Sequence, residues 1–326
     1  MMMILSTPTI SPPSSPPLSR FTCTPQCCRP HLRRSSSSNS PFPFTGRRIS
    51  RPALRRSSSN TQVIHHSTEE QPPPATILTA VRSIYNDITI LETPTSRILL
   101  LDSTHSIHSI INKEEKNKWT DSYWDEFATL PAIVPDGPIA IFGLGGGTAA
   151  DLMLHLWPSL YIEGWEIDEI LIHKSREFLG LSELEKCGRL KVRIGDALSA
   201  NASVPGGYAG IVVDLFSDGR ILPELEEVET WVEMKEKLMQ NGRIMVNCGG
   251  VCVEEVNKGC LDWEKNYALR AMKKAFDGEE LNWKIMAENK GANFLGLTGD
   301  LPDLSTWSSA LPDELSYSVH QWRRIC

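Results

Sequence analysis

The sequence predicts an α/β fold in which helices cover both faces of a mostly parallel β-sheet, with a small antiparallel β unit before it. Three observations predict this fold. From residue 138 onward, apolar strand-like runs alternate with helical runs, and a glycine-rich turn follows the first of these strands. Residues 76–112 instead hold β-branched residues alternating with polar ones, which is typical of strands joined by short turns.

The first 68 residues differ from the rest in composition. They contain nine Arg, no Lys, no Asp and no Glu, and they are dense in Ser and Pro. Such a segment cannot bury enough apolar surface to offset its chain entropy, so we expect it to be disordered. An Arg-rich, Ser-rich and acid-free composition is typical of an organelle transit peptide, and the Pro and Ser content favours the chloroplast. A disordered basic tail is the alternative interpretation.

The remaining residues are acidic and lack a membrane signal. All 40 acidic residues but only 24 of the 33 basic residues follow residue 68, which leaves a net charge of −16. This charge argues against nucleic-acid binding and is compatible with a cationic substrate. No apolar run approaches the roughly 18 residues of a transmembrane helix, so we expect a stromal protein without a membrane partner.

The cysteines after residue 68 form no CxxC pair and have no His at zinc spacing. Zinc sites in proteins need several thiolate or imidazole ligands at characteristic spacings. We therefore expect no metal.

The chain divides into a small β unit over residues 76–116 and a larger domain over residues 117–326. In the small unit, residues 83–93 and 96–111 are predicted as strands, separated by the turn-like TPTS. A helix is predicted at about residues 119–130, because a proline follows it.

The larger domain alternates strands and helices in a regular order. Seven strands are predicted, over residues 138–144, 160–167, 190–197, 208–216, 242–250, 282–288 and 293–299. Helices are predicted between them, over residues 148–157, 169–180, 224–239 and 267–276. This order favours right-handed crossovers and parallel neighbours, with the last two strands forming an antiparallel hairpin.

The stretch IAIFGLGGGTAAD, residues 139–151, predicts a nucleotide or nucleoside site, because a strand, a tight turn and a helix start follow in that order. No Lys follows the glycines, so a P-loop is excluded. Gly143 and Gly145 half-satisfy the dinucleotide pattern GxGxxG, with Thr148 at its last position. Glu166 ends the second strand, where an acidic residue binds ribose hydroxyls in dinucleotide and adenosyl sites alike.

Three later features favour an adenosyl group. Asp196 follows the third strand, where methyltransferase-like folds place a carboxylate that receives the adenine amino group. Asp214 ends the fourth strand, where the strand order would reverse. A helix, a glycine turn and a strand, LMQNGRIMV, come next. Together they predict a Rossmann-like class I methyltransferase fold with a seven-stranded, mostly parallel sheet.

The blocks over residues 80–250 resemble the spermidine synthase (polyamine aminopropyltransferase) family. SIYNDITILETPTSRILLLD is similar to its amino-terminal strand unit, and DSYWDEFATLPA to its DEFxYxExxxxxP segment. FGLGGGTAAD stands at its GGGDGG, EGWEID at its xxxEID, GDAL at its GDA and YAGIVVDLFSDG at its YDxIxxDxxD. The order and spacing of these blocks are similar to those of the family.

The resemblance implies a reaction, in which decarboxylated S-adenosylmethionine donates an aminopropyl group to a polyamine amine. By matching position, it implies that Asp214 acts as base and electrostatic anchor with Tyr123 assisting beside it. It also implies a nucleoside site, for which the candidate residues are Gly143, Gly145, Gly147, Glu166, Asp196 and Ala197. Members of the family often dimerise through the amino-terminal region, so the resemblance implies a homodimer.

Several family positions are altered. Gly146 stands where the family has an Asp that binds the amino group of the aminopropyl arm, and Trp124 stands where it has Gln. Asp125 replaces a Glu, and Ser217 replaces the second carboxylate of DxxD, with Asp218 one place later. The nucleoside half of the site is therefore predicted to be intact, and the aminopropyl and polyamine half to be altered.

Three functions stay open at this point. The first is a divergent aminopropyltransferase acting on polyamines in the plastid. The second is a methyltransferase that uses intact S-adenosylmethionine, since a lost carboxylate suits a donor that keeps its own. The third is a non-catalytic relative that binds a nucleoside or a protein partner. His105 and His108 alternate on the predicted strand, where a structural role is the simplest interpretation.

Overall fold

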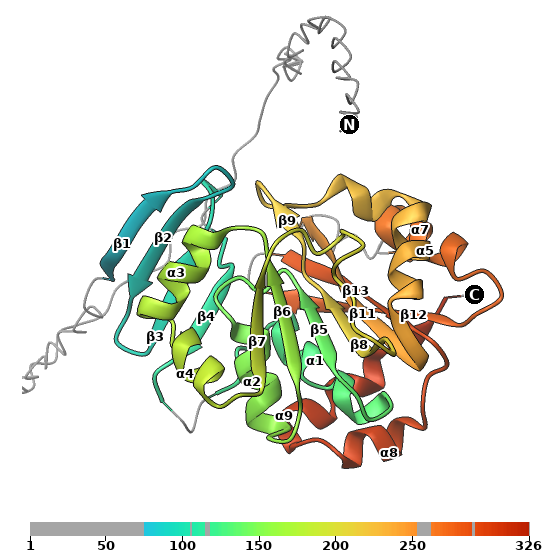
Figure 1. The fold of residues 1–326 in the computed structure, drawn as a ribbon. Coiled ribbons are helices and arrows are strands. Elements are labelled where there is room, and N and C mark those ends of the chain that lie inside the picture. The colour runs from blue at the N-terminus through green and yellow to red at the C-terminus, as the bar shows by residue number, and fades with distance from the viewer. Residues whose placement is uncertain (1–74, 105, 115–117, 253–261, 289–290, 326) are drawn as a thin grey trace, which may run out of the picture. The chain divides into compact units, whose positions relative to one another are not determined.

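The computed structural model describes residues 75–104, 106–114, 118–252, 262–288 and 291–325 (Figure 1). The expected transit peptide, residues 1–68, and His105 lie outside the described residues. Disorder and targeting of the first segment therefore stay predictions.

The predicted antiparallel unit is present in the described residues as a four-stranded sheet with the order β1-β2-β3-β4. Its strands are β1 (Thr76–Arg82), β2 (Asp87–Glu92), β3 (Ser96–Leu100) and β4 (Ser109–Asn112). Ile88, Ile90 and Leu99 are buried and pack against Leu171 and Leu179. Alternating residues thus attach this sheet to helix α3 (Glu169–Phe178) and its end.

Two details of this unit differ from the prediction. Residues 83–86 form a turn, because the Ser83 hydroxyl accepts the backbone N–H groups of Tyr85 and Asn86 at 3.0 and 2.9 Å. The strand predicted over residues 96–111 is divided into β3 and β4 by a loop. The Asp102 carboxylate accepts the backbone N–H of Thr104 at 2.8 Å and turns the chain there.

The large sheet holds eight strands within the described ranges, in the order β14-β12-β13-β11-β8-β5-β6-β7. The seven predicted strands are β5 (Ile139–Phe142), β6 (Ile162–Glu166), β7 (Leu190–Ile194), β8 (Tyr208–Val213), β11 (Leu238–Cys252), β12 (Leu281–Glu288) and β13 (Gly291–Thr298). The strands from β7 to β11 are parallel, and β13 pairs antiparallel with both β11 and β12. The eighth, β14 (Arg323–Arg324), is a two-residue edge strand too short to show a sequence period.

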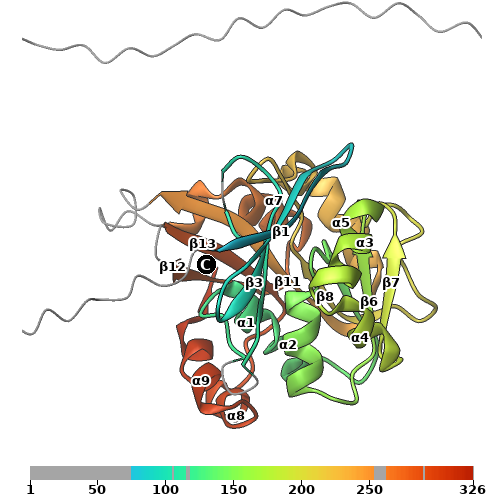
Figure 2. The ribbon, with the colours of Figure 1, turned by 90° about the vertical axis from the view of Figure 1, so that its left-hand side faces the viewer.

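The helices lie on both faces of this sheet (Figures 1 and 2). They are α1 (Tyr123–Phe127), α2 (Thr148–Leu156), α3, α4 (Leu181–Lys186), α5 (Val228–Glu236), α7 (Tyr267–Ala275), α8 (Leu304–Ser309) and α9 (Asp313–Ser316). Short 3-10 turns add η1 (Leu130–Ile133), η2 (Pro223–Glu226), η3 (Trp263–Lys265) and η4 (Ser318–Gln321). The helix predicted over residues 224–239 is thus η2 followed by α5, and β11 begins at Leu238.

The helix predicted at about residues 119–130 is shorter than expected, since α1 spans only five residues before η1 follows. The Asp125 carboxylate explains the late start. It accepts the backbone N–H of Thr120 at 2.9 Å and that of Asp121 at 2.8 Å. These bonds close a turn in which Asp121 has a φ of 55°, a conformation incompatible with a right-handed helix.

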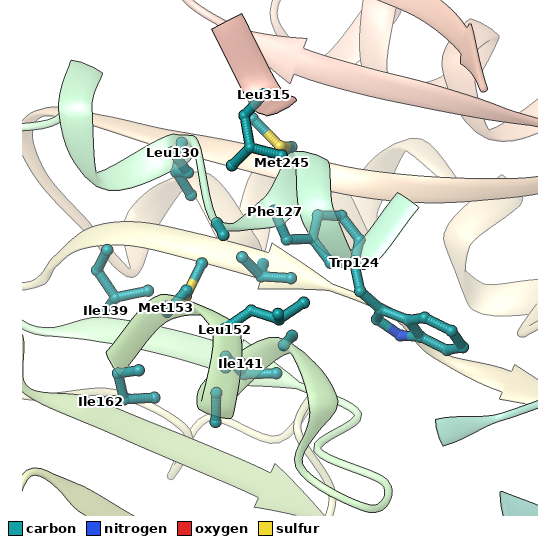
Figure 3. Packing of buried hydrophobic residues seen from close by; sticks show 14 of the residues in the cluster. Trp124, Phe127, Leu130, Ile139, Ile141, Leu152, Met153, Ile162, Met245 and Leu315 are labelled. Carbon is teal, nitrogen blue, oxygen red and sulfur yellow. The ribbon is translucent and has the colours of Figure 1, made fainter. Parts of the chain in front are cut away.

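The period of β5 divides the core into two layers. Ile139 and Ile141 belong to one buried cluster, and Ala140 and Phe142 belong to the other. Figure 3 shows the first cluster, in which Phe127 of α1 lies near β5 and α2. The buried sheet with helices on both faces explains why the strands read as continuous apolar runs.

The order of the strands creates a crevice between β5 and β8. The chain runs from β5 outward to β6 and β7, and then returns to place β8 on the other side of β5. Connections leave the carboxyl ends of β5 and β8 in opposite directions, and open α/β sheets bind ligands at such a point. The predicted glycine turn and Asp214 follow these two strands.

Candidate functional site

A cleft of about 1360 Å³ lies at the carboxyl ends of β5, β6, β7 and β8. Its other walls come from the turn at residues 84–86, the β3–β4 loop and residues 120–124. Within the described residues, the cleft therefore brings together segments from the small sheet, the helix α1 region and four strand ends.

The glycine turn after β5 forms part of the lining of the cleft. Gly143 has a φ of 88°, and a Cβ on it would lie 2.2 Å from the backbone oxygen of Asp214, so the close approach of the two strand ends requires glycine. The Gly145 N–H donates to Oε2 of Glu166 at 3.0 Å, and the Asp168 N–H donates to Oε1 at 3.1 Å. Burial raises the pKa of Glu166, and these two hydrogen bonds oppose that rise.

The loop after β7 supplies the other predicted nucleoside residues. Asp196 is exposed, and its Oδ1 accepts the backbone N–H of Leu198 at 2.8 Å. Ala197 is buried, and both residues line the cleft. The structure thus brings Gly143, Gly145, Glu166, Asp196 and Ala197 to one cavity, as the strand ends predict.

Gly147 is the exception among the predicted nucleoside residues. It does not line the cleft; it precedes α2 with a φ of 93°, and a Cβ on it would lie 3.0 Å from the Leu181 side chain. Its place explains why glycine is needed there, because the helix start adopts a left-handed conformation. Gly147 therefore shapes the turn but is not part of the lining of the cleft.

Asp214 follows β8 and lines the cleft. The Tyr123 hydroxyl and the Trp124 Nε1–H donate to its Oδ2 at 3.2 and 3.3 Å, and Asn247 Nδ2 donates to its Oδ1 at 3.1 Å. Trp124, one of the altered family positions, thus supplies a donor to Asp214. Asn247 was not predicted; its signal is a polar residue within the apolar run of β11, beside the end of β8.

The charges of the cleft have one sign. Among its described lining residues are five carboxylates and neither Lys nor Arg; the carboxylates belong to Asp121, Glu166, Asp196, Asp214 and Asp218. A concave surface with only negative side chains attracts cations and repels anions. The site is therefore suited to a cationic ligand.

Gly146 is another of the altered family positions named above. It is buried, and its N–H donates to the Ser109 hydroxyl at 2.8 Å. A Cβ on it would lie 2.6 Å from Cβ of Ser109 and 2.7 Å from the Leu179 side chain. A side chain here would collide with β4 and the end of α3, and Gly146 does not line the cleft.

The other altered positions lie in two different places in the structure. Asp125 is buried, turned toward the backbone of Thr120 and Asp121, and burial raises its pKa. Ser217 and Asp218 are exposed in the hairpin of β9 (Phe216–Ser217) and β10 (Arg220–Ile221), where they line the cleft. The carboxylate of Asp218 thus lines the cleft on the hairpin, one position after Ser217.

His108 also lines the cleft, where the sequence indicated a structural residue on a strand. Its Nε2 lies 3.2 Å from Oδ2 of Asp102. The sequence offers a weak signal for the pair, because the two residues are separated by a turn. His155 is exposed on α2, with its ring 6.4 Å from that of Trp119.

In the part of the chain that the structure describes, no helix is long and apolar enough to cross a bilayer. Over the same ranges, no three His, Cys, Asp or Glu residues gather as a metal site. Cys187 is an exposed free thiol and Cys248 a buried one, and burial raises the pKa of the Cys248 thiol.

One curated protein gives a sequence match. A Bifidobacterium longum protein named "Probable polyamine aminopropyl transferase" is 25% identical over 166 residues. The match covers 51% of this chain and 36% of that protein, so it spans about a third of the relative's length. No protein-family model matches the chain.

Solved spermidine synthases share the fold. One in complex with the transition state analogue AdoDATO has a TM-score of 0.53 and 18% identity over 71% of this chain and 75% of its own. Spermidine synthase from Thermotoga maritima has a TM-score of 0.53 and 17% identity, over 73% of this chain and 77% of its own. A probable spermidine synthase from Corynebacterium glutamicum has a TM-score of 0.57 and 18% identity, over 77% of this chain and 90% of its own. The predicted Rossmann-like, methyltransferase-type fold with an amino-terminal antiparallel unit is confirmed.

Proposed function

Because this chain is a spermidine synthase-like protein with a methyltransferase-type fold, we propose that it transfers an aminopropyl group from decarboxylated S-adenosylmethionine to an amine. The observation that carries the proposal is the charge of the cleft: five carboxylates and neither Lys nor Arg among its described lining residues. Both substrates of this reaction are cations, a sulfonium and an ammonium. Carboxylates without competing cations stabilise them in a partly dry cleft.

The nucleoside part of the donor has matching groups. The two oxygens of Glu166 accept the N–H of Gly145 in the glycine turn and the N–H of Asp168 before α3, so Glu166 is held as an acceptor for the two ribose hydroxyls. Asp196 stands at the rim, where it accepts the adenine amino group. Gly143 and Gly145 leave room for the nucleoside to approach the backbone.

The reacting part lies at Asp214. Its carboxylate receives hydrogen bonds from Tyr123, Trp124 and Asn247, which stabilise its charged form and fix its direction. A carboxylate held in this way anchors the acceptor amine beside the sulfonium. The acceptor ammonium gives one proton to the Asp214 carboxylate, which leaves a neutral amine, and the carboxylic acid later returns this proton to water. The lone pair of the amine nitrogen forms a bond to the carbon next to sulfur, and the electron pair of the breaking C–S bond goes to sulfur, which leaves neutral methylthioadenosine.

A methyltransferase that uses intact S-adenosylmethionine is the second candidate. The packing around Gly146 favours it, because this position carries no carboxylate for the amino group of a decarboxylated donor. The charge of the cleft favours the first candidate, because the carboxylate of intact S-adenosylmethionine would meet five carboxylates and no Lys or Arg among the described lining residues. The cleft charge involves more groups, so we rank aminopropyl transfer first.

The test is a comparison of two donors with the full chain. Calorimetry should show tighter binding of decarboxylated than of intact S-adenosylmethionine. Release of methylthioadenosine should require an added amine, such as putrescine or spermidine. Release of S-adenosylhomocysteine from intact donor would identify a methyltransferase, and binding of neither donor would identify a non-catalytic relative.

We also propose that the protein acts in the chloroplast stroma, as the composition of residues 1–68 predicts. The homodimer expected from the resemblance stays a prediction.

A further inference from the structure

Asp168 joins the β1–β2 turn, residues 83–86, to the strand end that carries Glu166. Asp168 is 1% exposed. Its Oδ2 accepts the Ser83 hydroxyl and, at 2.8 Å, the Nδ2–H of Asn86. Its backbone N–H donates to Oε1 of Glu166 at 3.1 Å. Hydrogen bonds through one buried residue therefore connect the turn to the carboxylate that is proposed to bind the ribose.

The turn and the start of α3 are both fixed by this arrangement. The Ser83 hydroxyl, which donates to Asp168, also accepts the backbone N–H groups of Tyr85 and Asn86. The Ser83 N–H donates to the Asn86 carbonyl at 2.9 Å and closes the turn. The other oxygen of Asp168 accepts two backbone N–H groups in the first turn of α3, at 3.0 and 3.1 Å. One side chain thus holds the turn, the helix start and the strand end together.

Large apolar side chains are exposed at this part of the cleft. Ile84 and Tyr85 in the turn are 89% and 48% exposed, and Ile167, between Glu166 and Asp168, is 42% exposed. All three line the cleft. Exposed apolar side chains that gather beside a concave site are typical of a surface that a ligand covers. Because the turn is attached to Glu166, the ligand group at this position is the adenosyl part of the donor.

We propose that the β1–β2 turn is part of the donor site, with Tyr85 packing on the bound adenosyl group and Asp168 holding the turn beside Glu166. This inference rests on the proposed function and deepens it, because it adds a wall from the small sheet to the nucleoside site. Tyr85 contacts the donor, whereas Asp168 is a positioning residue. Donor binding then buries the Tyr85 ring, and contact between an aromatic ring and a base is favourable.

Hydrogen exchange of the full chain tests the turn without turnover. The amides of Tyr85 and Asn86 exchange when their hydrogen bonds to the Ser83 hydroxyl open. A donor that packs on the turn opposes this opening, so methylthioadenosine should slow exchange over residues 83–87. Residues 313–317, at α9 and outside the cleft, are the internal control and should exchange at an unchanged rate.

Calorimetry gives the second readout. Tyr85→Ala should weaken methylthioadenosine binding by roughly fivefold to a hundredfold, the range for alanine substitution of an aromatic residue stacked on a base. Tyr85→Phe should keep the affinity, because the ring is retained. Tyr317→Ala, at a position 74% exposed outside the cleft, should leave the affinity unchanged. At saturating donor, the KM for spermidine should be the same in all three variants.

A double-mutant cycle tests the positioning role of Asp168 through its partner in the turn. Substitution of Asp168 itself would also remove the cap of α3, so Asn86→Ala is the sharper variant. Asn86→Ala should weaken methylthioadenosine binding. The combination with Tyr85→Ala should bind no more weakly than Tyr85→Ala alone, because Asn86 acts through the turn that carries Tyr85. Additive losses would show that the bond between Asn86 and Asp168 does not position Tyr85.

The outcomes separate this inference from the proposed function. Unchanged affinity in Tyr85→Ala, or unchanged exchange in the turn when methylthioadenosine binds, overturns the role of the turn and leaves the proposed function standing. Loss of self-association in Tyr85→Ala with unchanged affinity, measured by ultracentrifugation, would assign the turn to a subunit interface and overturn the inference as well. Absence of methylthioadenosine binding by the unmodified chain overturns the proposed nucleoside site, and the role of the turn falls with it.

Discussion

Lys284 of β12 and Glu126 of α1 form an ion pair in the core, with Nζ 2.6 Å from Oε2 and both side chains 0% exposed. Glu126 Oε1 accepts the Trp322 Nε1–H at 2.7 Å, and Lys284 Nζ donates to the Ser318 carbonyl at 2.8 Å. The pair therefore attaches α1, which carries Tyr123 and Trp124, to the carboxyl-terminal segment.

Removal of one partner of this pair should destabilise the protein strongly. Lys284→Met leaves the Glu126 carboxylate buried without its cation, which costs about 3–5 kcal/mol in comparable pairs. Denaturant unfolding should show this loss in the free energy of unfolding. Lys235→Met is the control, because its ion pair with Glu279 is 41% and 46% exposed and should contribute less than about 1 kcal/mol. Equal losses of unfolding free energy in the two variants would show that burial does not determine how much an ion pair contributes to stability.

Glu166→Ala should weaken nucleoside binding. The ribose hydroxyls lose a charged acceptor, and such hydrogen bonds contribute roughly 1.5–3 kcal/mol each, so affinity should fall at least about tenfold. Calorimetry with methylthioadenosine measures it, and Glu169→Ala on the exposed start of α3 is the control. Because burial raises the pKa of Glu166, affinity should also decline as pH falls through a pKa above its ordinary value of 4.5. Binding of NAD by the chain instead of methylthioadenosine would refute the assignment of this site to an adenosyl ligand.

Asp214→Asn should separate nucleoside binding from amine binding. The substitution keeps shape and removes the charge, so methylthioadenosine should bind nearly as before. The acceptor loses a charge-assisted hydrogen bond, and kcat/KM for the amine should fall roughly tenfold to a hundredfold. Steady-state kinetics with spermidine measures it, with Asp136→Asn, an exposed position outside the cleft, as the control. Unchanged kcat/KM would remove Asp214 from the reaction.

Gly146→Asp should destabilise the protein and should not restore the family's donor contact. Its side chain would begin 2.6 Å from Ser109 and 2.7 Å from Leu179, and Gly146 itself does not line the cleft. Overpacking costs about 1–3 kcal/mol, and an unpaired buried carboxylate adds to it. Thermal unfolding should show a lower Tm, and Gly146→Ala should show a smaller decrease of the same sign. Tighter binding of decarboxylated S-adenosylmethionine by Gly146→Asp would contradict the geometry.

A fusion of residues 1–70 to a fluorescent protein should enter chloroplasts. The segment contains nine Arg, and no acidic residue precedes Glu69, which is typical of a transit peptide. Microscopy of plant cells measures the location, and replacement of the nine Arg by Gln should abolish import. Fluorescence that stays in the cytosol with the native segment would leave only the interpretation of a disordered basic tail.

The sequence by itself determined the order of the elements and the place of the nucleoside residues. Periods of apolar residues mark the strands. Glu166 is the last residue of its strand, and Gly143, Asp196 and Asp214 come shortly after the ends of theirs. The carboxyl ends of parallel strands meet at one edge of a sheet, so local pattern alone was enough to predict that these residues share a cleft. Short elements such as β14 could not be predicted, because two residues show no period.

Only the tertiary structure decided the partners of the reacting groups. Trp124 and Asn247 lie 90 and 33 residues from Asp214 in the chain, and Glu126 lies 158 residues from Lys284. Such contacts depend on how side chains from separate elements pack, which no local period encodes. The lack of room for a Cβ on Gly146 depends on β4 and the end of α3 in the same way.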